Sequence, residues 1–208
     1  KALGKNPNNP SLYIILGLAY SRIKQLKKAL KTYYKAFPYI QGDKGEIYYL
    51  IGLAYVSNGD HFSEAIDVFK LSLQENPTNL DAYLQLGNIY LEQANFEQAI
   101  DCYRQVIAQD MNVVKAYMGL AYVYQLKGNF ERAIKYNRMA IKVDKENVEC
   151  LYQLGVLHYQ LGDWNKSLRY FQDAIELQPN HASSYNYLGS VFRILGCNQK
   201  AVAAFKQA

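Results

Sequence analysis

The sequence predicts an all-α chain built from repeated antiparallel helix pairs. Tyr83, Leu86 and Tyr90 recur at helical spacing, so their side chains share one face of a first helix. Ala99 and Tyr103 lie four residues apart and form a matching apolar face on a second helix. Variants of this pattern return every 34 or 35 residues along the chain. Each copy is therefore expected to fold as a hairpin of two short helices.

A small residue marks each copy of the pattern. Glycine inside a helix costs about 1 kcal/mol relative to alanine. We therefore expect a glycine such as Gly87 to be needed for close approach of the partner helix. The separations between successive marks are 35, 35, 34, 34 and 34 residues. The marks are Gly17, Gly52, Gly87, Ala121, Gly155 and Gly189.

The copies follow one another without a linker or a low-complexity segment. One array over residues 1–208 is therefore predicted, in which each repeat contacts mainly its neighbours. Residues 1–9 resemble the tail of a preceding repeat, because Ala2 and Pro7 share the offset of Ala174 and Pro179. We expect the chain to be a fragment of a longer array. The predicted repeats span about 10–44, 45–79, 80–113, 114–147, 148–181 and 182–208, the last one truncated.

Short turns are predicted between the two helices of each copy. Gly59, Gly128 and Gly162 lie in these turns, where glycine suits a left-handed helix end. The fourth copy departs from the pattern at two places. It has Ala121 in place of the glycine and Asn137 in place of the aromatic residue of the second helix.

The repeated pattern resembles the tetratricopeptide repeat family over essentially the whole chain. The family has a period near 34, an aromatic, leucine-glycine and tyrosine pattern in the first helix, and alanine, phenylalanine and a late proline afterwards. Tyr83, Leu86, Gly87 and Tyr90 match the first helix, and Pro179 matches the late proline. The resemblance implies a right-handed superhelical solenoid of antiparallel helix pairs. It also implies that the first helices line a concave groove.

Composition and motifs favour a binding protein rather than an enzyme. A net charge of +5 from 23 basic and 18 acidic residues falls short of a nucleic-acid-binding patch, so no nucleic-acid partner is expected. The apolar runs are too short to span a bilayer, and no direct membrane contact is expected. No phosphate-binding loop or catalytic motif is present, so we expect no catalytic residues and no cofactor.

The histidines and cysteines are also poorly placed for chemistry. His61 and His158 lie far apart in the sequence, and His181 is also distant from both, so no metal site is expected. The three cysteines form no Cys-x-x-Cys pair, which favours reduced thiols and a cytoplasmic location.

A second stripe of mainly apolar residues begins one position after each core aromatic of the first helices. Stacked repeats would join these stripes into a continuous strip, and extended apolar surfaces usually mark interaction sites. The alternative is that the stripe packs between neighbouring first helices. The candidate groove-lining, partner-binding residues are Ile14, Leu18, Tyr49, Leu53, Leu84, Asn88, Leu91, Met118, Tyr122, Tyr152, Val156, Tyr159, Asn186 and Arg193.

These residues predict a non-catalytic scaffold that binds a protein or peptide in its groove. Glu46, Asp81 and Glu149 share one place in their repeats and favour a partner with basic flanks. The clamp with which some family members hold chaperone C-termini is absent, because Leu18, Asp81 and other residues stand in its places.

Two other functions stay open. The chain is similar to substrate-recruiting arrays of larger enzymes, such as the O-linked N-acetylglucosamine transferase, in which groove asparagines form a ladder. Only Asn88 resembles a rung of that ladder. Alternatively, the groove or the open ends of the array mediate self-association.

Two basic clusters lie on predicted second helices. We interpret them as solvated outer faces rather than as sites for an acidic partner or a nucleic acid. Binding to a polyanion with strong salt dependence would overturn that interpretation. The clusters are Lys27, Lys31 and Lys35 in the first repeat and Arg132, Lys135 and Arg138 in the fourth.

Overall fold

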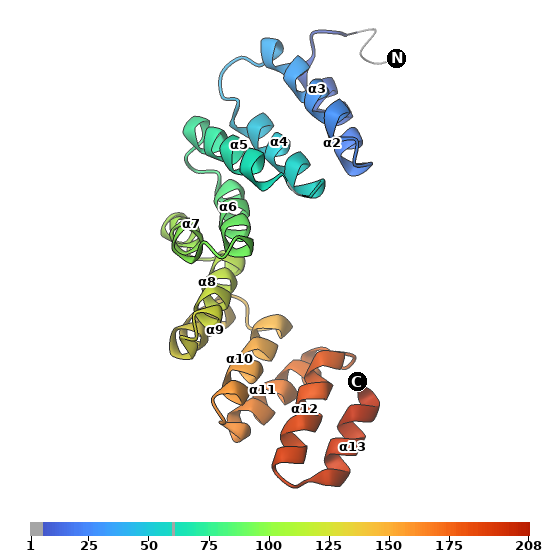
Figure 1. Ribbon diagram of the computed structural model, residues 1–208, viewed down its shortest axis with the longest axis vertical. Helices are drawn as coiled ribbons and strands as arrows, with labels where there is room; N and C mark the ends of the chain where they lie inside the picture. The colour runs from blue at the N-terminus through green and yellow to red at the C-terminus, as the bar shows by residue number, and fades with distance from the viewer. Residues whose placement is uncertain (1–5, 60) are drawn as a thin grey trace. The chain divides into compact units, whose positions relative to one another are not determined.

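The structure is a computed structural model that describes residues 6–59 and 61–208. These residues form twelve α-helices and one short 3₁₀ helix, with no β-strand among them, so the predicted all-α class is confirmed (Figure 1). Ala2, which supports the predicted repeat tail, lies outside the described residues. The internal contacts divide the chain into two compact units, Lys1–Gln105 and Val106–Ala208. The single array over residues 1–208 stays a prediction.

Unit 1 consists of helix pairs, and the second helices α3 and α5 also contact the first helix of the next pair. The helices of the first two pairs pack against each other, and α3 contacts α4 as α5 contacts α6. The first helices α2 and α4 also contact each other. The helices of unit 1 are α2 (Pro10–Arg22), α3 (Leu26–Ala36), η1 (Phe37–Tyr39), α4 (Gly45–Ser57), α5 (Phe62–Glu75), α6 (Leu80–Glu92) and α7 (Phe96–Gln109), which ends in unit 2.

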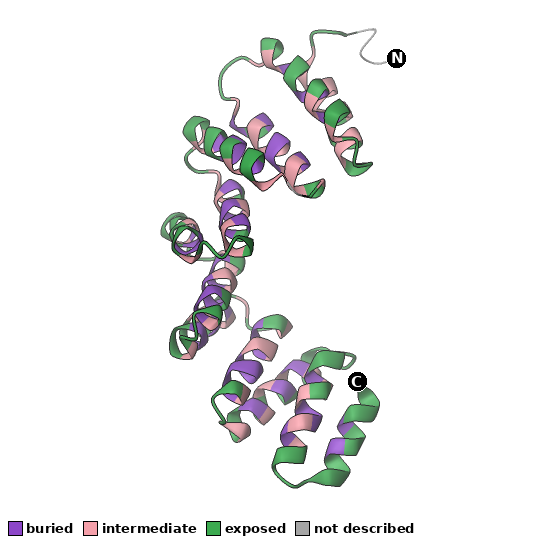
Figure 2. Ribbon diagram, in the orientation of Figure 1, coloured by how far each residue is buried: buried purple, intermediate pink, exposed green. Residues whose placement is uncertain are grey.

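Unit 2 repeats this arrangement. The pairs are α8 with α9, α10 with α11, and α12 with α13, and α9 contacts α10 as α11 contacts α12. Figure 2 shows the buried residues along the helices, whereas the turns between them are coloured exposed or intermediate. The helices of unit 2 are α8 (Val114–Leu126), α9 (Phe130–Val143), α10 (Val148–Gln160), α11 (Trp164–Leu177), α12 (Ala182–Ile194) and α13 (Asn198–Gln207).

Local sequence explains where the helices begin and end. The Asn79 side chain accepts a hydrogen bond from the Ala82 amide at 3.1 Å and caps the start of α6. Gly59, Gly128 and Gly162 follow the C-terminal ends of α4, α8 and α10 and have φ of 71°, 70° and 73°. This left-handed conformation favours glycine, so the predicted helix ends are confirmed.

The marked glycines allow the two helices of a pair to approach closely. A Cβ atom built on Gly87 would lie 2.7 Å from Cε1 of Tyr103, and one on Gly155 would lie 2.6 Å from Cε1 of Phe171. Carbon atoms do not pack at such distances without displacement, so the predicted reason for the glycines is confirmed. The equivalent contacts are Gly17 with Tyr33, Gly52 with Phe69, and Gly189 with Phe205.

The fourth pair replaces both members of this contact. Ala121 and Asn137 occupy the two places, and both are buried. Asparagine is smaller than an aromatic residue, so the added methyl group of alanine is matched by a smaller side chain opposite. The Asn137 side-chain Nδ2 donates to the Ala133 carbonyl at 3.3 Å. This buried nitrogen therefore has a hydrogen-bond partner within its own helix.

We expect Gly155→Ala to destabilise unit 2. The new methyl group would collide with Phe171, and overpacking of this kind costs about 1–3 kcal/mol. That cost outweighs the gain of about 1 kcal/mol in helix propensity. Chemical denaturation followed by circular dichroism measures the change. Gln172→Ala, at an exposed position of α11, is the control and should stay within about 0.5 kcal/mol of the parent. A more stable Gly155→Ala variant would contradict the role given to the glycine.

His158 is a buried titratable group in the core of unit 2. Its ring stacks on Tyr170 with 5.5 Å between centroids, and its Nδ1 lies 3.6 Å from Oδ2 of Asp163. Burial lowers the pKa of His158, and Lys166 and Arg138 lower it further, while Asp163 opposes the shift. The folded chain therefore binds the proton on His158 less well than the unfolded chain does.

Stability should fall as the pH drops below about 6.5, the ordinary pKa of histidine. In that range the unfolded state takes up a proton that folded His158 resists, so acid favours unfolding. His158→Tyr should flatten this part of the profile, because Tyr124 stacks on Tyr136 in the same way in the preceding repeat. Thermal unfolding of both proteins between about pH 5 and pH 8 tests this. Identical profiles for the two proteins would show that His158 does not contribute to the loss of stability in acid.

Candidate functional site

The candidate residues lie on first helices, and we call the set in unit 1 row 1 and the set in unit 2 row 2. Row 1 lies on α2, α4 and α6, and row 2 lies on α8, α10 and α12. Row 1 consists of Ile14, Leu18, Tyr49, Leu53, Leu84, Asn88 and Leu91. Row 2 consists of Met118, Tyr122, Tyr152, Val156, Tyr159, Asn186 and Arg193.

Only part of each row faces solvent. Leu18 is 37% exposed and Tyr122 is 49% exposed, so each unit presents one large apolar side chain on its row. Asn88, Asn186 and Arg193 are also exposed. A partner that touches these rows would therefore meet isolated apolar side chains among polar ones.

Two members of the rows belong to the interior. Leu84 and Val156 are buried, with 8% and 6% of their surface exposed. Val156 packs in one core cluster with Phe171 and Val191. Such residues support the surface from below and have little area left for a partner. The other members are half-buried.

Tyr49 and Tyr152 occupy the same place in their repeats and reach the next repeat. Tyr49 packs 5.8 Å from the ring of Phe69 in its own pair and also lies against a cluster that contains Leu86 of α6. Burial together with the Asp81 carboxylate raises the pKa of Tyr49. Tyr152 lies 5.8 Å from the ring of Tyr187 on α12, and burial also raises its pKa. For these two residues the alternative of packing between neighbouring repeats describes the observed contacts.

Tyr187 joins the aromatic residues of row 2, although the sequence analysis did not select it. Its ring lies 5.4 Å from that of Tyr159 and 5.3 Å from that of Phe171. The predicted stripe begins one residue after each core aromatic and therefore contains Asn186 instead of Tyr187. Tyr187 lies three residues after buried Ser184, and that helical spacing is the signal that could have identified it.

Asn88 is held by a residue of the second helix. The Tyr103 hydroxyl donates to Oδ1 of Asn88 at 2.8 Å. Tyr33 occupies the same place as Tyr103, but in its repeat Leu18 replaces the asparagine. The Tyr33 hydroxyl is buried and has no hydrogen-bond partner among the described residues, and burial raises its pKa to about 12. Asn88 therefore has a structural role in addition to its exposure on row 1.

The same substitution should have opposite effects at the two tyrosines. Tyr103→Phe removes a hydrogen bond and leaves the Asn88 carbonyl without that donor, which should cost about 0.5–1.5 kcal/mol. Tyr33→Phe removes a buried hydroxyl that lacks a partner, so it should be neutral or stabilise by about 1 kcal/mol. Denaturant unfolding of the two variants measures the difference. Equal destabilisation by both would show that Asn88 contributes nothing to Tyr103.

The rest of the described chain offers little chemistry. Among residues 6–59 and 61–208, no group of three or more His, Cys, Asp or Glu side chains could hold a metal ion. Burial raises the pKa of the Cys102 and Cys150 thiols to about 12, so both stay protonated and unreactive near neutral pH. No helix within the described ranges is long and apolar enough to cross a membrane.

Family models described as tetratricopeptide repeat match most of the chain. The matched residues are 10–37, 58–117, 114–147, 148–181 and 170–203. No curated protein matches the chain in sequence.

Solved structures share the fold at low sequence identity. The C-terminal part of a TPR repeat-containing protein from Cytophaga hutchinsonii is 19% identical, with a TM-score of 0.80 over 98% of this chain and 84% of that one. Pseudomonas aeruginosa pilF is 15% identical, with a TM-score of 0.78 over 97% and 90% of the two chains. YrrB, described as a TPR protein with an unusual peptide-binding site, is 22% identical, with a TM-score of 0.67 over 88% and 93%. These likenesses confirm the solenoid fold.

Proposed function

The chain belongs to the tetratricopeptide repeat family, and from that premise we propose that it is a non-catalytic scaffold. In this proposal, its first helices bind a protein or peptide partner. The observation that carries the proposal is the exposure of Leu18 and Tyr122 on first helices. A tyrosine that is half exposed offers a large apolar ring and a hydroxyl group, which suits an interface anchor.

The charges beside the rows support a partner with apolar anchors and basic flanks. Glu46, Asp81 and Glu149 are exposed in the first turns of α4, α6 and α10. Carboxylates placed there would attract lysine or arginine on either side of an anchor. The fold shared with YrrB, for which a peptide-binding site is described, also supports a peptide ligand.

Other expectations from the sequence stay predictions. They are the cytoplasmic location and the lack of nucleic-acid and membrane partners. Recruitment of substrates to a larger enzyme and self-association also stay predictions. No contact between described residues favours either of these two functions over the scaffold.

Replacing the two exposed anchors should weaken partner binding without unfolding the chain. We expect Leu18→Ala with Tyr122→Ala to weaken binding at least tenfold, because truncation of an interface anchor commonly costs more than about 1 kcal/mol. Tyr159 is left intact because its ring packs 5.2 Å from Trp164. Affinity capture with quantitative mass spectrometry identifies the partner, and isothermal titration with that partner measures the change.

The matched control removes apolar area from second helices instead. Leu71 and Leu177 are 38% and 43% exposed on α5 and α11, so Leu71→Ala with Leu177→Ala removes comparable surface. This control should bind the partner like the parent chain. Equal binding by both double variants, with unchanged circular dichroism, would refute binding through the first helices.

A further inference from the structure

The charges of unit 1 are separated along the chain. The first 42 residues contain eight lysines and arginines and no aspartate or glutamate. Residues 43–105 contain ten acidic residues and only three basic ones. The net charge of the whole chain conceals this separation, because the two parts largely cancel.

Three exposed lysines lie along one face of α3. Lys27, Lys31 and Lys35 are exposed and follow one another at intervals of four residues, which places them on one helical face. We call these three residues the lysine face. The face extends about 12 Å along the helix axis. None of the three has an ion-pair partner within the described part of the chain, so their charges are available to a partner.

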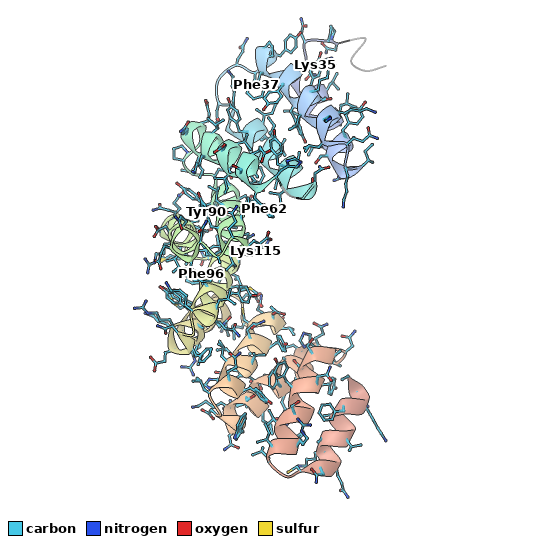
Figure 3. All side chains as sticks on the ribbon, in the orientation of Figure 1. Lys35, Phe37, Phe62, Tyr90, Phe96 and Lys115 are labelled. Atoms are coloured by element: carbon cyan, nitrogen blue, oxygen red, sulfur yellow. The ribbon has the colours of Figure 1, made fainter. Side chains whose placement is uncertain are left out.

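A depression lined by tyrosines adjoins the lysine face. It encloses about 640 Å³, and Lys31 and Lys35 are part of its lining. Figure 3 shows Lys35 and Phe37 where the chain leaves α3. We call this depression the tyrosine depression. Its lining residues are Tyr13, Lys31, Tyr34, Lys35, Pro38 and Tyr39.

The walls of the tyrosine depression are ordered by contacts within unit 1. Tyr13 and Tyr39 stack with 5.9 Å between centroids and 7° between planes, and the Tyr13 hydroxyl donates to the Pro7 carbonyl at 2.8 Å. Tyr34 stacks on Phe37 at 5.7 Å and is still 51% exposed. Aromatic walls held in place before binding can bury an apolar or aromatic side chain at low entropic cost.

The sequence alone favours a solvated outer face for these lysines, but the ordered depression beside them changes that interpretation. We infer that the lysine face and the tyrosine depression dock a short acidic segment of a partner protein. One apolar or aromatic side chain of that segment enters the depression, and its carboxylates pair with Lys27, Lys31 and Lys35. An extended chain rises about 3.3 Å per residue, so about four residues span the face. The lysine face lies on the second helix α3, and Tyr13 of α2 completes the depression. No residue of this surface belongs to row 1 or row 2, so the inference does not depend on the proposed binding through those rows.

The charge pattern favours a short acidic segment over a nucleic acid. A longer polyanion that ran past the lysine face would meet the excess of carboxylates in residues 43–105. Like charges repel it there, whereas an acidic run of a few residues ends before that region. The depression can take one side chain, and three lysines lie beside it. This arrangement fits a peptide segment that has one apolar or aromatic residue among its acidic residues.

Fluorescence anisotropy with labelled synthetic peptides tests the inference. The probe is an acidic heptapeptide, Glu and Asp in alternation around a central phenylalanine. The first comparison peptide has alanine at the centre, and the second has lysines in place of the acids. We expect the acidic phenylalanine peptide to bind best and its affinity to fall as salt rises from about 50 to about 300 mM. Equal binding of the lysine peptide, or no salt dependence, would overturn the inference.

Two variants separate the roles of charge and depression. Lys27→Gln, Lys31→Gln and Lys35→Gln combined should weaken the acidic peptide at least tenfold. Lys135→Gln, Arg138→Gln and Lys142→Gln on α9 are the matched control and should leave it unchanged. Tyr34→Ala should remove the preference for phenylalanine over alanine in the peptide but keep the salt dependence. Equal loss in the α9 control would show non-specific attraction and overturn the inference.

Two further probes test the other anionic partners. A single-stranded oligouridylate and vesicles containing phosphatidylserine should bind more weakly than the acidic phenylalanine peptide. Tighter binding of either probe, lost with the three lysine substitutions, would replace the acidic segment by that ligand. Circular dichroism of each variant confirms that the fold is retained.

Discussion

Every described helix pair except α8 with α9 depends on one close contact, in which an aromatic ring of the second helix lies against a glycine of the first. Helices of 13 or 14 residues, such as α10 and α11, are marginal in isolation and need a buried face. The ring of Phe171 contributes to that buried face, and the missing side chain of Gly155 allows the ring to approach the backbone closely. A single pair does not complete its core, because Ala65 and Phe69 of α5 share one cluster with Ala82 and Leu86 of the next pair.

The sequence predicts these contacts well because backbone geometry allows few residues there. Gly87 is demanded by the ring of Tyr103, and Gly162 by a positive φ, so both places are recognisable without a structure. The exchange at Ala121 and Asn137 was also visible in the sequence. Its meaning became clear only when the two buried side chains were seen to replace the usual glycine and ring.

The candidate surface was less predictable, because exposure on a first helix depends on the neighbouring repeats. Tyr122 and Val156 occupy the same place in their repeats, yet Tyr122 is half exposed and Val156 is buried. Asn88 is tied to Tyr103, a contact between helices that periodicity does not reveal. The stacking of Tyr13 on Tyr39 joins residues of different helices, so the depression beside the lysines could not be foreseen either.

The separated charges of unit 1 also affect how a partner arrives. A body with excess positive charge near α3 and excess negative charge in the repeats that follow has an electric dipole. The field of an approaching anionic protein exerts a torque on such a dipole and turns the lysine side toward it before contact. The rate of productive encounter, and not only the lifetime of the complex, therefore depends on where the chain places its carboxylates.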